Sequence, residues 1–132
     1  MKFYELRRET ASNSYEYRRM NEYLPASVFG SRLRQARHQA NIPQDKLGVE
    51  IGLDEGTASA RISRYETGVH EPPFEIAVKL AKALAVPTAF FYCEDDALAQ
   101  LLLTWQRLNA IERTFLQSFI NENLPSRTPP AS

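Results

Sequence analysis

The stretch "PQDKLGVEIGLDEGTASARISRYETG", residues 43–68, decides the fold. It opens with a proline, which suits the first position of a helix, and then places Leu47 and Ile51 four residues apart on one helical face. The glycine that follows allows the chain to turn. The remainder reads as a second helix that passes through Ile62 and stops at Gly68. The stretch therefore predicts two short helices joined by a tight turn.

Further helices are predicted on both sides of this pair. Ser27 can cap a helix that ends near Asn41, and Pro73 fits the start of another, after which "TAFFYCEDD" continues as a short helical turn. The apolar stripes of the two flanking helices consist of Phe29, Leu33, Ala36 and Ala40, and of Ile76, Leu80, Ala81 and Leu84. Because no segment alternates between polar and apolar residues as strands do, the predicted fold class is all-α.

Two amphipathic helices are predicted at the C-terminal end. The first runs from Glu94 to about Leu108, and the pair Asn109 and Glu112 reads as a capping pair that opens the second. Their apolar stripes consist of Leu98, Leu101, Leu102 and Trp105, and of Ile111, Phe115, Phe119 and Ile120. Such stripes either cover the core of their own chain or meet a second copy.

Length and composition limit the class of protein. The 132 residues, 43% of them apolar, suit one compact domain with appended helices. No apolar run approaches the roughly 18 residues of a membrane span, and the first residues lack the apolar core of a secretion signal. We therefore expect a cytoplasmic protein with no membrane association.

Charge gives a weak indication of a nucleic-acid partner. The chain has 16 basic and 16 acidic residues, so its formal net charge is zero. The basic residues are concentrated in the first two thirds, since residues 28–70 hold six Lys or Arg against five Asp or Glu, whereas residues 94–132 hold three against five. The distribution is more informative than the sum.

Catalytic and metal-binding patterns are not found. The single cysteine, Cys93, cannot form an internal disulfide and, next to "EDD", reads as a packed or idle thiol. His38 and His70 lie too far apart in the sequence to suggest a metal site, and "EDD" suits the start of a helix. No Gly-rich phosphate loop or Ser-His arrangement is present. We expect neither an enzyme nor a cofactor.

The order and spacing of several segments resemble the lambda repressor and Cro-like regulators, the XRE family. The matching segments are "RLRQAR", "PQDKLGVEIGL", "ISRYETG", and "KLAKALAVP" followed by "FFY", which together span residues 29–92. The resemblance implies a five-helix bundle whose third helix enters the major groove of DNA. The chain then divides into a polar N-terminal arm (1–24), the helix-turn-helix domain (25–93), C-terminal helices for dimerisation (94–124) and a disordered tail (125–132).

The DNA-contacting residues are expected mainly on the outer face of the third helix. Winding that helix so that Ala58, Ile62 and Tyr65 face the core leaves the others outside, and Arg64 is the best base reader because its guanidinium can pair with both guanine acceptors. An ordinary solvated helix face is the alternative. Gln44 can meet a phosphate at the start of the second helix, or it is simply a polar helix start. The expected DNA-binding residues are Gln44, Thr57, Ser59, Ala60, Arg61, Ser63, Arg64 and Thr67.

The resemblance also concerns three residues inside the domain. Arg37 and Glu66 match the positions of a buried ion pair that joins the first helix to the third, although two solvated charges remain an alternative. Gly48 stands where the family usually has alanine, which costs about 0.5–1 kcal/mol of helix propensity.

Relative to the family pattern, about four residues are inserted between Asp54 and Ile62. Four residues make about 400° of α-helix, so they can lengthen the third helix by one turn and nearly preserve its phase. In that case Asp54 caps the helix. Alternatively, residues 52–56 form a longer loop with Thr57 as the cap and Gly56 at positive φ.

The expected function is a sequence-specific regulator of transcription that binds double-stranded DNA, a repressor that acts as a homodimer on an inverted repeat. Because a bundle of about 65 residues already closes in the family, the two extra helices need another surface to cover them. The residues expected in the dimer interface are Leu98, Leu101, Leu102, Trp105, Phe115 and Phe119. The alternative is a helix-turn-helix antitoxin or adaptor whose C-terminal helices bind a partner protein.

Overall fold

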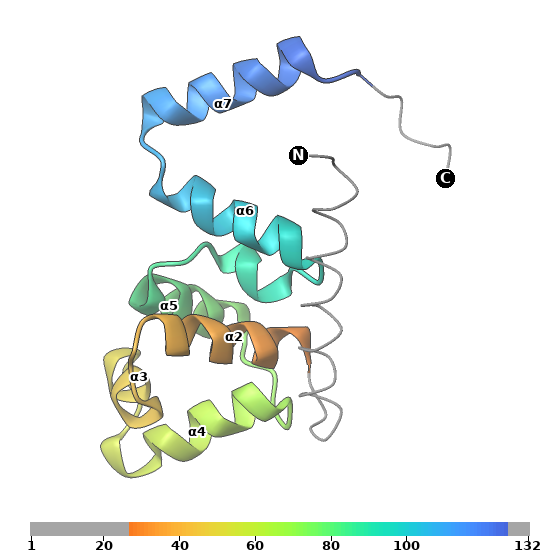
Figure 1. Ribbon diagram of the computed structural model, residues 1–132. Helices are drawn as coiled ribbons and strands as arrows, with labels where there is room; N and C mark the ends of the chain where they lie inside the picture. The colour runs from red at the N-terminus through yellow and green to blue at the C-terminus, as the bar shows by residue number, and fades with distance from the viewer. Residues whose placement is uncertain (1–26, 127–132) are drawn as a thin grey trace.

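The computed structural model describes residues 27–126, and the regular secondary structure in that range is all helical (Figure 1). The all-α prediction is confirmed. The expected N-terminal arm and residues 127–132 of the expected tail lie outside the described residues. The elements are α2 (Val28–Gln39), α3 (Gln44–Glu50), α4 (Glu55–Thr67), α5 (Phe74–Leu84), the 3-10 helix η1 (Thr88–Tyr92), α6 (Asp96–Arg107) and α7 (Ala110–Asn123).

Helix α2 begins where the sequence predicts. The Ser27 hydroxyl accepts a hydrogen bond from the Gly30 backbone N–H at 3.0 Å, which satisfies one of the free donors at the helix start. The predicted stripe is correct for its first three members, but Ala40 is exposed. Helix α2 ends at Gln39, and Asn41 adopts a positive φ of 55°, so Ala40 lies beyond the last turn that packs on the core.

Helices α2 to α5 and η1 enclose one apolar core. Helix α5 turns Ala77 inward, and Ile76 of the predicted stripe is only half-buried. The 3-10 helix places two phenylalanines under α2, where the rings of Phe29 and Phe91 lie 5.0 Å apart. The largest fully buried side chains come from every part of the bundle: Leu33, Leu47, Ile62, Leu80, Phe90 and Phe91.

A buried arginine fastens α6 to this core. The Arg32 guanidinium donates to the backbone oxygens of Cys93 at 2.8 Å and Glu94 at 3.2 Å, and to Asp96 Oδ1 at 2.9 Å. Because Asp95 accepts from the Leu98 backbone N–H at 2.9 Å, α6 starts at Asp96 rather than at Glu94. The sequence "EDD" therefore lies at the start of α6, as predicted.

Helix α6 packs on the core mainly with residues other than those of its predicted apolar stripe. Ala99 and Leu103 face the core, whereas Leu98 and Leu101 are 50% and 62% exposed. Leu102 packs partly against the core, and Trp105 is half-buried. The four leucine and tryptophan side chains thus do not form a single face toward the core.

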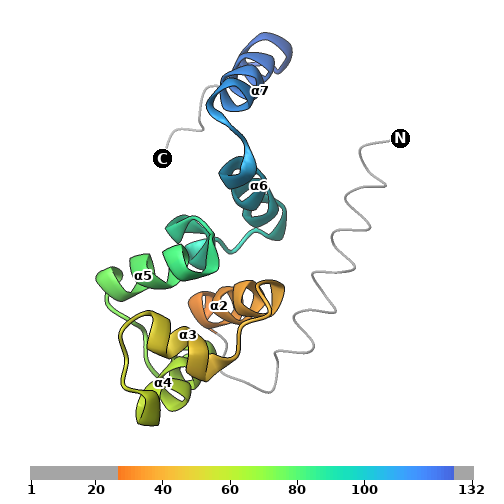
Figure 2. The same cartoon turned by 90° about the vertical axis from the view of Figure 1, so that its left-hand side faces the viewer.

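Helix α7 extends away from the bundle (Figures 1 and 2). None of its residues is buried. The predicted capping pair is confirmed, because Asn109 Oδ1 accepts from the Glu112 backbone N–H at 2.8 Å and Glu112 Oε1 accepts from the Asn109 backbone N–H at 2.9 Å. Within residues 27–126, no helix has the length and apolar character needed to cross a membrane.

Gly48 is required by the close approach of α3 to α4. A Cβ atom at this position would lie 2.6 Å from Ala58 Cβ and 2.9 Å from Ala58 Cα, which is closer than such atoms can pack. Gly56, the second residue of α4, has nothing within 4 Å of its Cβ position. The two helical glycines therefore differ in what alanine would do there.

We expect Gly48→Ala to lower the free energy of unfolding by about 1–3 kcal/mol, because the clash with Ala58 outweighs the gain in helix propensity. Gly56→Ala should raise it by a few tenths to about 1 kcal/mol, because the open site receives only that gain. Urea denaturation of the full chain measures both. A stabilised Gly48→Ala variant would show that α3 and α4 do not approach as closely as described.

Candidate nucleic-acid interface

The turn between α3 and α4 is formed by local backbone hydrogen bonds. Gly52 adopts a φ of 95°, a conformation that favours glycine. The backbone N–H of Gly52 donates to Val49 O at 3.0 Å, and that of Leu53 donates to Gly48 O at 2.9 Å. These bonds close the C-terminal end of α3 and direct the chain into α4.

The inserted residues lengthen α4 by one turn. The helix starts at Glu55, with Asp54 in extended conformation at the N-cap position, so the long-loop alternative is wrong. Gly52 and Gly68 have positive φ among the described glycines, and Gly56 does not. The Asp54 side chain makes no capping hydrogen bond, so only its backbone position matches the prediction.

The inner and outer faces of α4 are divided as the sequence indicates. Ala58, Ile62 and Tyr65 are buried, together with Glu66. The Thr67 hydroxyl donates to Ser63 O at 3.0 Å, within the last turn. On the outer face, the structure exposes Thr57, Ser59, Ala60, Arg61 and Arg64 and half-buries Ser63 and Thr67.

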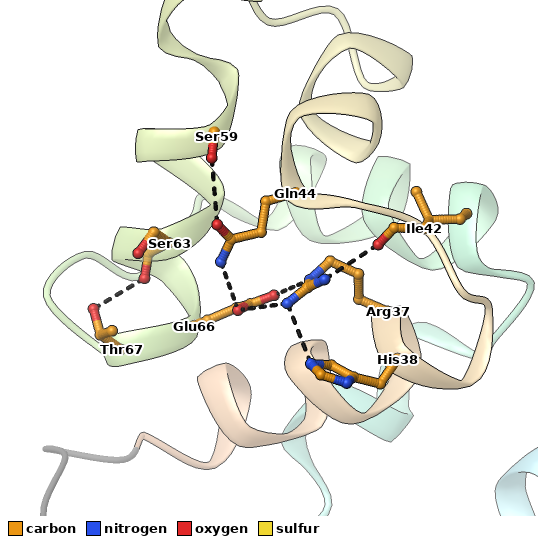
Figure 3. A network of polar contacts seen from close by, with 8 residues as sticks. All are labelled: Arg37, His38, Ile42, Gln44, Ser59, Ser63, Glu66 and Thr67. Carbon is orange, nitrogen blue, oxygen red and sulfur yellow. Dashed lines mark hydrogen bonds and ion pairs between the residues drawn. The ribbon is translucent and has the colours of Figure 1, made fainter.

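A buried carboxylate joins three helices beneath this face (Figure 3). Glu66 on α4 forms an ion pair with Arg37 on α2, in which Arg37 Nε donates to Oε1 and Nη2 donates to Oε2 at 3.3 Å. The two side chains are only 13% and 5% exposed, so they are not two solvated charges. Arg37 Nη1 also donates to the Ile42 carbonyl at 3.2 Å, which fixes the segment that leads into α3.

Gln44 connects α3 to α4 through both ends of its amide. Its Nε2 donates to Glu66 Oε2 at 3.0 Å, and its Oε1 accepts from the Ser59 hydroxyl at 3.3 Å (Figure 3). Sequence reasoning did not predict this bridge, because the three residues are separated by 7 to 22 positions and nothing in their spacing indicates contact. The amide is therefore already hydrogen-bonded before any ligand is present.

Charge is unevenly distributed along α4. Asp54 and Glu55 lie at its N-terminal end, and Arg61 and Arg64 lie on the exposed C-terminal half. Within residues 27–126, neither arginine side chain makes an ion pair or a side-chain hydrogen bond, so both guanidinium groups keep all their donors available. The same part of the chain contains no group of three side chains suited to holding a metal ion.

Comparisons with known proteins agree with this geometry. A helix-turn-helix family model matches residues 33–91, the segment from α2 to η1. A solved structure, described as the crystal structure of the transcriptional regulator BswR, is 40% identical over 70% of this chain and 91% of that chain, with a TM-score of 0.68. None of the curated proteins matches the chain. The chain belongs to the XRE family of helix-turn-helix DNA-binding regulators.

Proposed function

We propose that this protein is a sequence-specific regulator of transcription that reads double-stranded DNA with the outer face of α4. The observation that carries the proposal is the pair of exposed arginines, Arg61 and Arg64, which have no ion-pair partner within residues 27–126, on a helix whose opposite face is fixed in the core. A rigid helix of this kind can enter the major groove without further rearrangement.

Arg64 is the principal base-reading residue in this proposal. Its guanidinium can donate two parallel hydrogen bonds to the acceptors of one guanine, which discriminates between base pairs by about 1–3 kcal/mol. Arg61 lies one turn earlier on the exposed surface of α4 and can contact a neighbouring base or phosphate. Weaker contacts come from the other outer residues: Thr57, Ser59, Ala60, Ser63 and Thr67.

Gln44 has a supporting role. Its amide can reach a phosphate only by giving up the hydrogen bond to Ser59 or the one to Glu66. We assign it first to orienting the Ser59 hydroxyl and holding α3 against α4. Gln44 contacts a phosphate only if a hydrogen bond to that phosphate replaces one of these two bonds.

The added turn of α4 restricts how the helix can lie on DNA. Asp54 and Glu55 would repel the phosphate backbone, so the N-terminal end of α4 does not rest on it. The arginine-bearing half then provides the contacts that determine affinity. The added turn changes which bases lie within reach of Thr57, but the helix remains the reading element.

The simplest mechanism is repression by a homodimer that binds an inverted repeat and excludes polymerase from a promoter. Two copies related by a two-fold axis present two α4 helices to successive major grooves. The protein acts in the cytoplasm, on the nucleoid when bound, and needs no cofactor or catalytic activity. The second candidate is an antitoxin or adaptor, which the uncovered apolar surface of α7 favours, and co-purification of a partner protein would identify it.

Replacing Arg64 with alanine tests the reading face. On the site selected from random duplex DNA, Arg64→Ala should weaken binding by about 1–3 kcal/mol, and on unselected DNA by much less. Arg107→Ala, which removes an exposed arginine from α6, is the matched control and should change neither affinity. Equal losses on both DNAs would assign Arg64 to the phosphate backbone instead.

The homodimer predicts paired half-sites. Footprinting should show two inverted half-sites whose centres are about 10–10.5 base pairs apart, or a multiple of that distance, because both α4 helices must meet the same side of the duplex. Protection of single, unpaired half-sites would contradict the homodimer and leave base reading by α4 intact.

A further inference from the structure

Within residues 27–126, no segment covers the apolar face of α7. Ile111, Phe115 and Phe119 are 82%, 73% and 50% exposed, and Ile120 and Leu124 are 45% and 55% exposed. An isolated helix of this length is marginally stable in water and depends on packing of its apolar face. A second surface must therefore cover this face.

One arginine of α7, Arg113, binds the end of α6 at the joint between the two helices. Arg113 Nε donates to Trp105 O at 3.1 Å, and its Nη2 donates to Gln106 O at 3.4 Å. The same guanidinium lies 5.2 Å from the centre of the Trp105 ring. Arg113 thus satisfies carbonyls at the end of α6, where cations are favoured, and stacks on the same turn.

The start of α7 is fixed independently at the same joint. The reciprocal hydrogen bonds of Asn109 and Glu112 set the angle at which the chain enters the helix. With Arg113 bonded to the end of α6, the direction of α7 is fixed from both sides. Helix α7 therefore extends away from the bundle (Figures 1 and 2), and none of its residues is buried.

Helix α6 also exposes large apolar side chains. Leu98 and Leu101 are half-exposed or more, while Arg32 and the buried residues Ala99 and Leu103 anchor α6 to the bundle. An aromatic side chain buries about 150–250 Å² when it is fully covered. Phe115 and Phe119, with the exposed aliphatic side chains of α6 and α7, therefore provide a large part of the about 800 Å² that one partner contributes to a standard protein interface. We call α6 and α7 together, residues 96–123, the C-terminal arm.

The charge pattern of the C-terminal arm favours a second copy of this chain as the partner. No residue is charged between Ala97 and Gln106 or between Thr114 and Asn121. Two identical surfaces of this kind can meet without bringing like charges together, and they provide no charge pattern that would select a different partner. The arm also lies at the end of the molecule opposite α4, so pairing leaves the DNA-reading face free (Figures 1 and 2).

We infer that the C-terminal arms of two copies pair through the exposed faces of α6 and α7, and that Arg113 is a positioning residue that sets the angle of the pairing. The inference rests on the proposed homodimer. Because Arg32 fixes α6 to the DNA-reading bundle and Arg113 fixes α7 to α6, the arm holds the two α4 helices at one separation. The half-site spacing is therefore determined at the α6–α7 joint.

Sedimentation equilibrium of the full chain tests the pairing surface. The wild type should be a dimer, and Phe115→Glu should raise the dimer dissociation constant by about tenfold or more, because a charge enters the apolar contact. Gln117→Glu is the matched control: it adds the same charge to an exposed polar position of α7 and should leave the constant within about twofold. Circular dichroism checks that each variant is folded.

Different failures have different meanings. A monomeric wild type would overturn the proposed homodimer together with this inference, even if another protein bound the arm. A wild-type dimer that persists unchanged in Phe115→Glu would place the interface elsewhere and overturn the inference alone. Neither result affects the assignment of α4 as the reading helix, which Arg64→Ala tests separately.

Spacing selectivity tests the positioning role of Arg113. Wild-type protein should bind one spacer length between the selected half-sites best and lose affinity when base pairs are inserted or removed. Arg113→Ala should reduce that preference while single half-site binding is unchanged, and Arg107→Ala, at the neighbouring end of α6, should retain it. An unchanged spacer preference in Arg113→Ala would overturn the positioning role.

Discussion

The buried carboxylate of Glu66 is the constraint on which the proposed DNA-reading surface depends. It lies on α4 and accepts hydrogen bonds from Arg37 of α2 and Gln44 of α3. A buried charge is stable only when its partners satisfy it, so the three helices must keep their relative positions for this contact to persist. The same bridge continues from Gln44 to Ser59 on the outer face. The surface that we propose to meet DNA is thus fixed from beneath by a buried interaction.

Residues 55–58, which the family resemblance marks as an insertion, form the first turn of α4, and one of them packs against α3. Ala58 belongs to the inserted residues and lies against Gly48, where no Cβ atom could fit. The family resemblance implies alanine at that position, and the glycine costs α3 about 0.5–1 kcal/mol of helix propensity. The longer helix keeps its phase because four residues return it to within about 40°. Ile62 and Tyr65 therefore still reach the core, and the chain retains the architecture of its family with a longer reading helix.

Local sequence patterns predicted most of the fold. The cap at Ser27, the capping pair that opens α7 and the inner face of α4 depend on residues at most one or two turns apart. Contacts between distant residues could not be found in this way. Arg32 binds groups 61 to 64 residues along the chain, and the bridge at Gln44 depends on how α3 crosses α4. The sequence left open which face of α6 packs on the core for a related reason: several of its faces carry apolar residues, and only the position of the bundle decides which of them is covered.

The central claim is that the outer face of α4 is the surface that meets DNA. Amide chemical shifts of isotope-labelled protein, recorded as the selected duplex is added, test this claim most directly. The largest changes should fall on residues 57–67 of α4, with smaller ones at the first turn of α3 and little change at the α6–α7 joint beyond that caused by dimer formation. Changes concentrated in α6 and α7, with α4 unaffected, would contradict the claim.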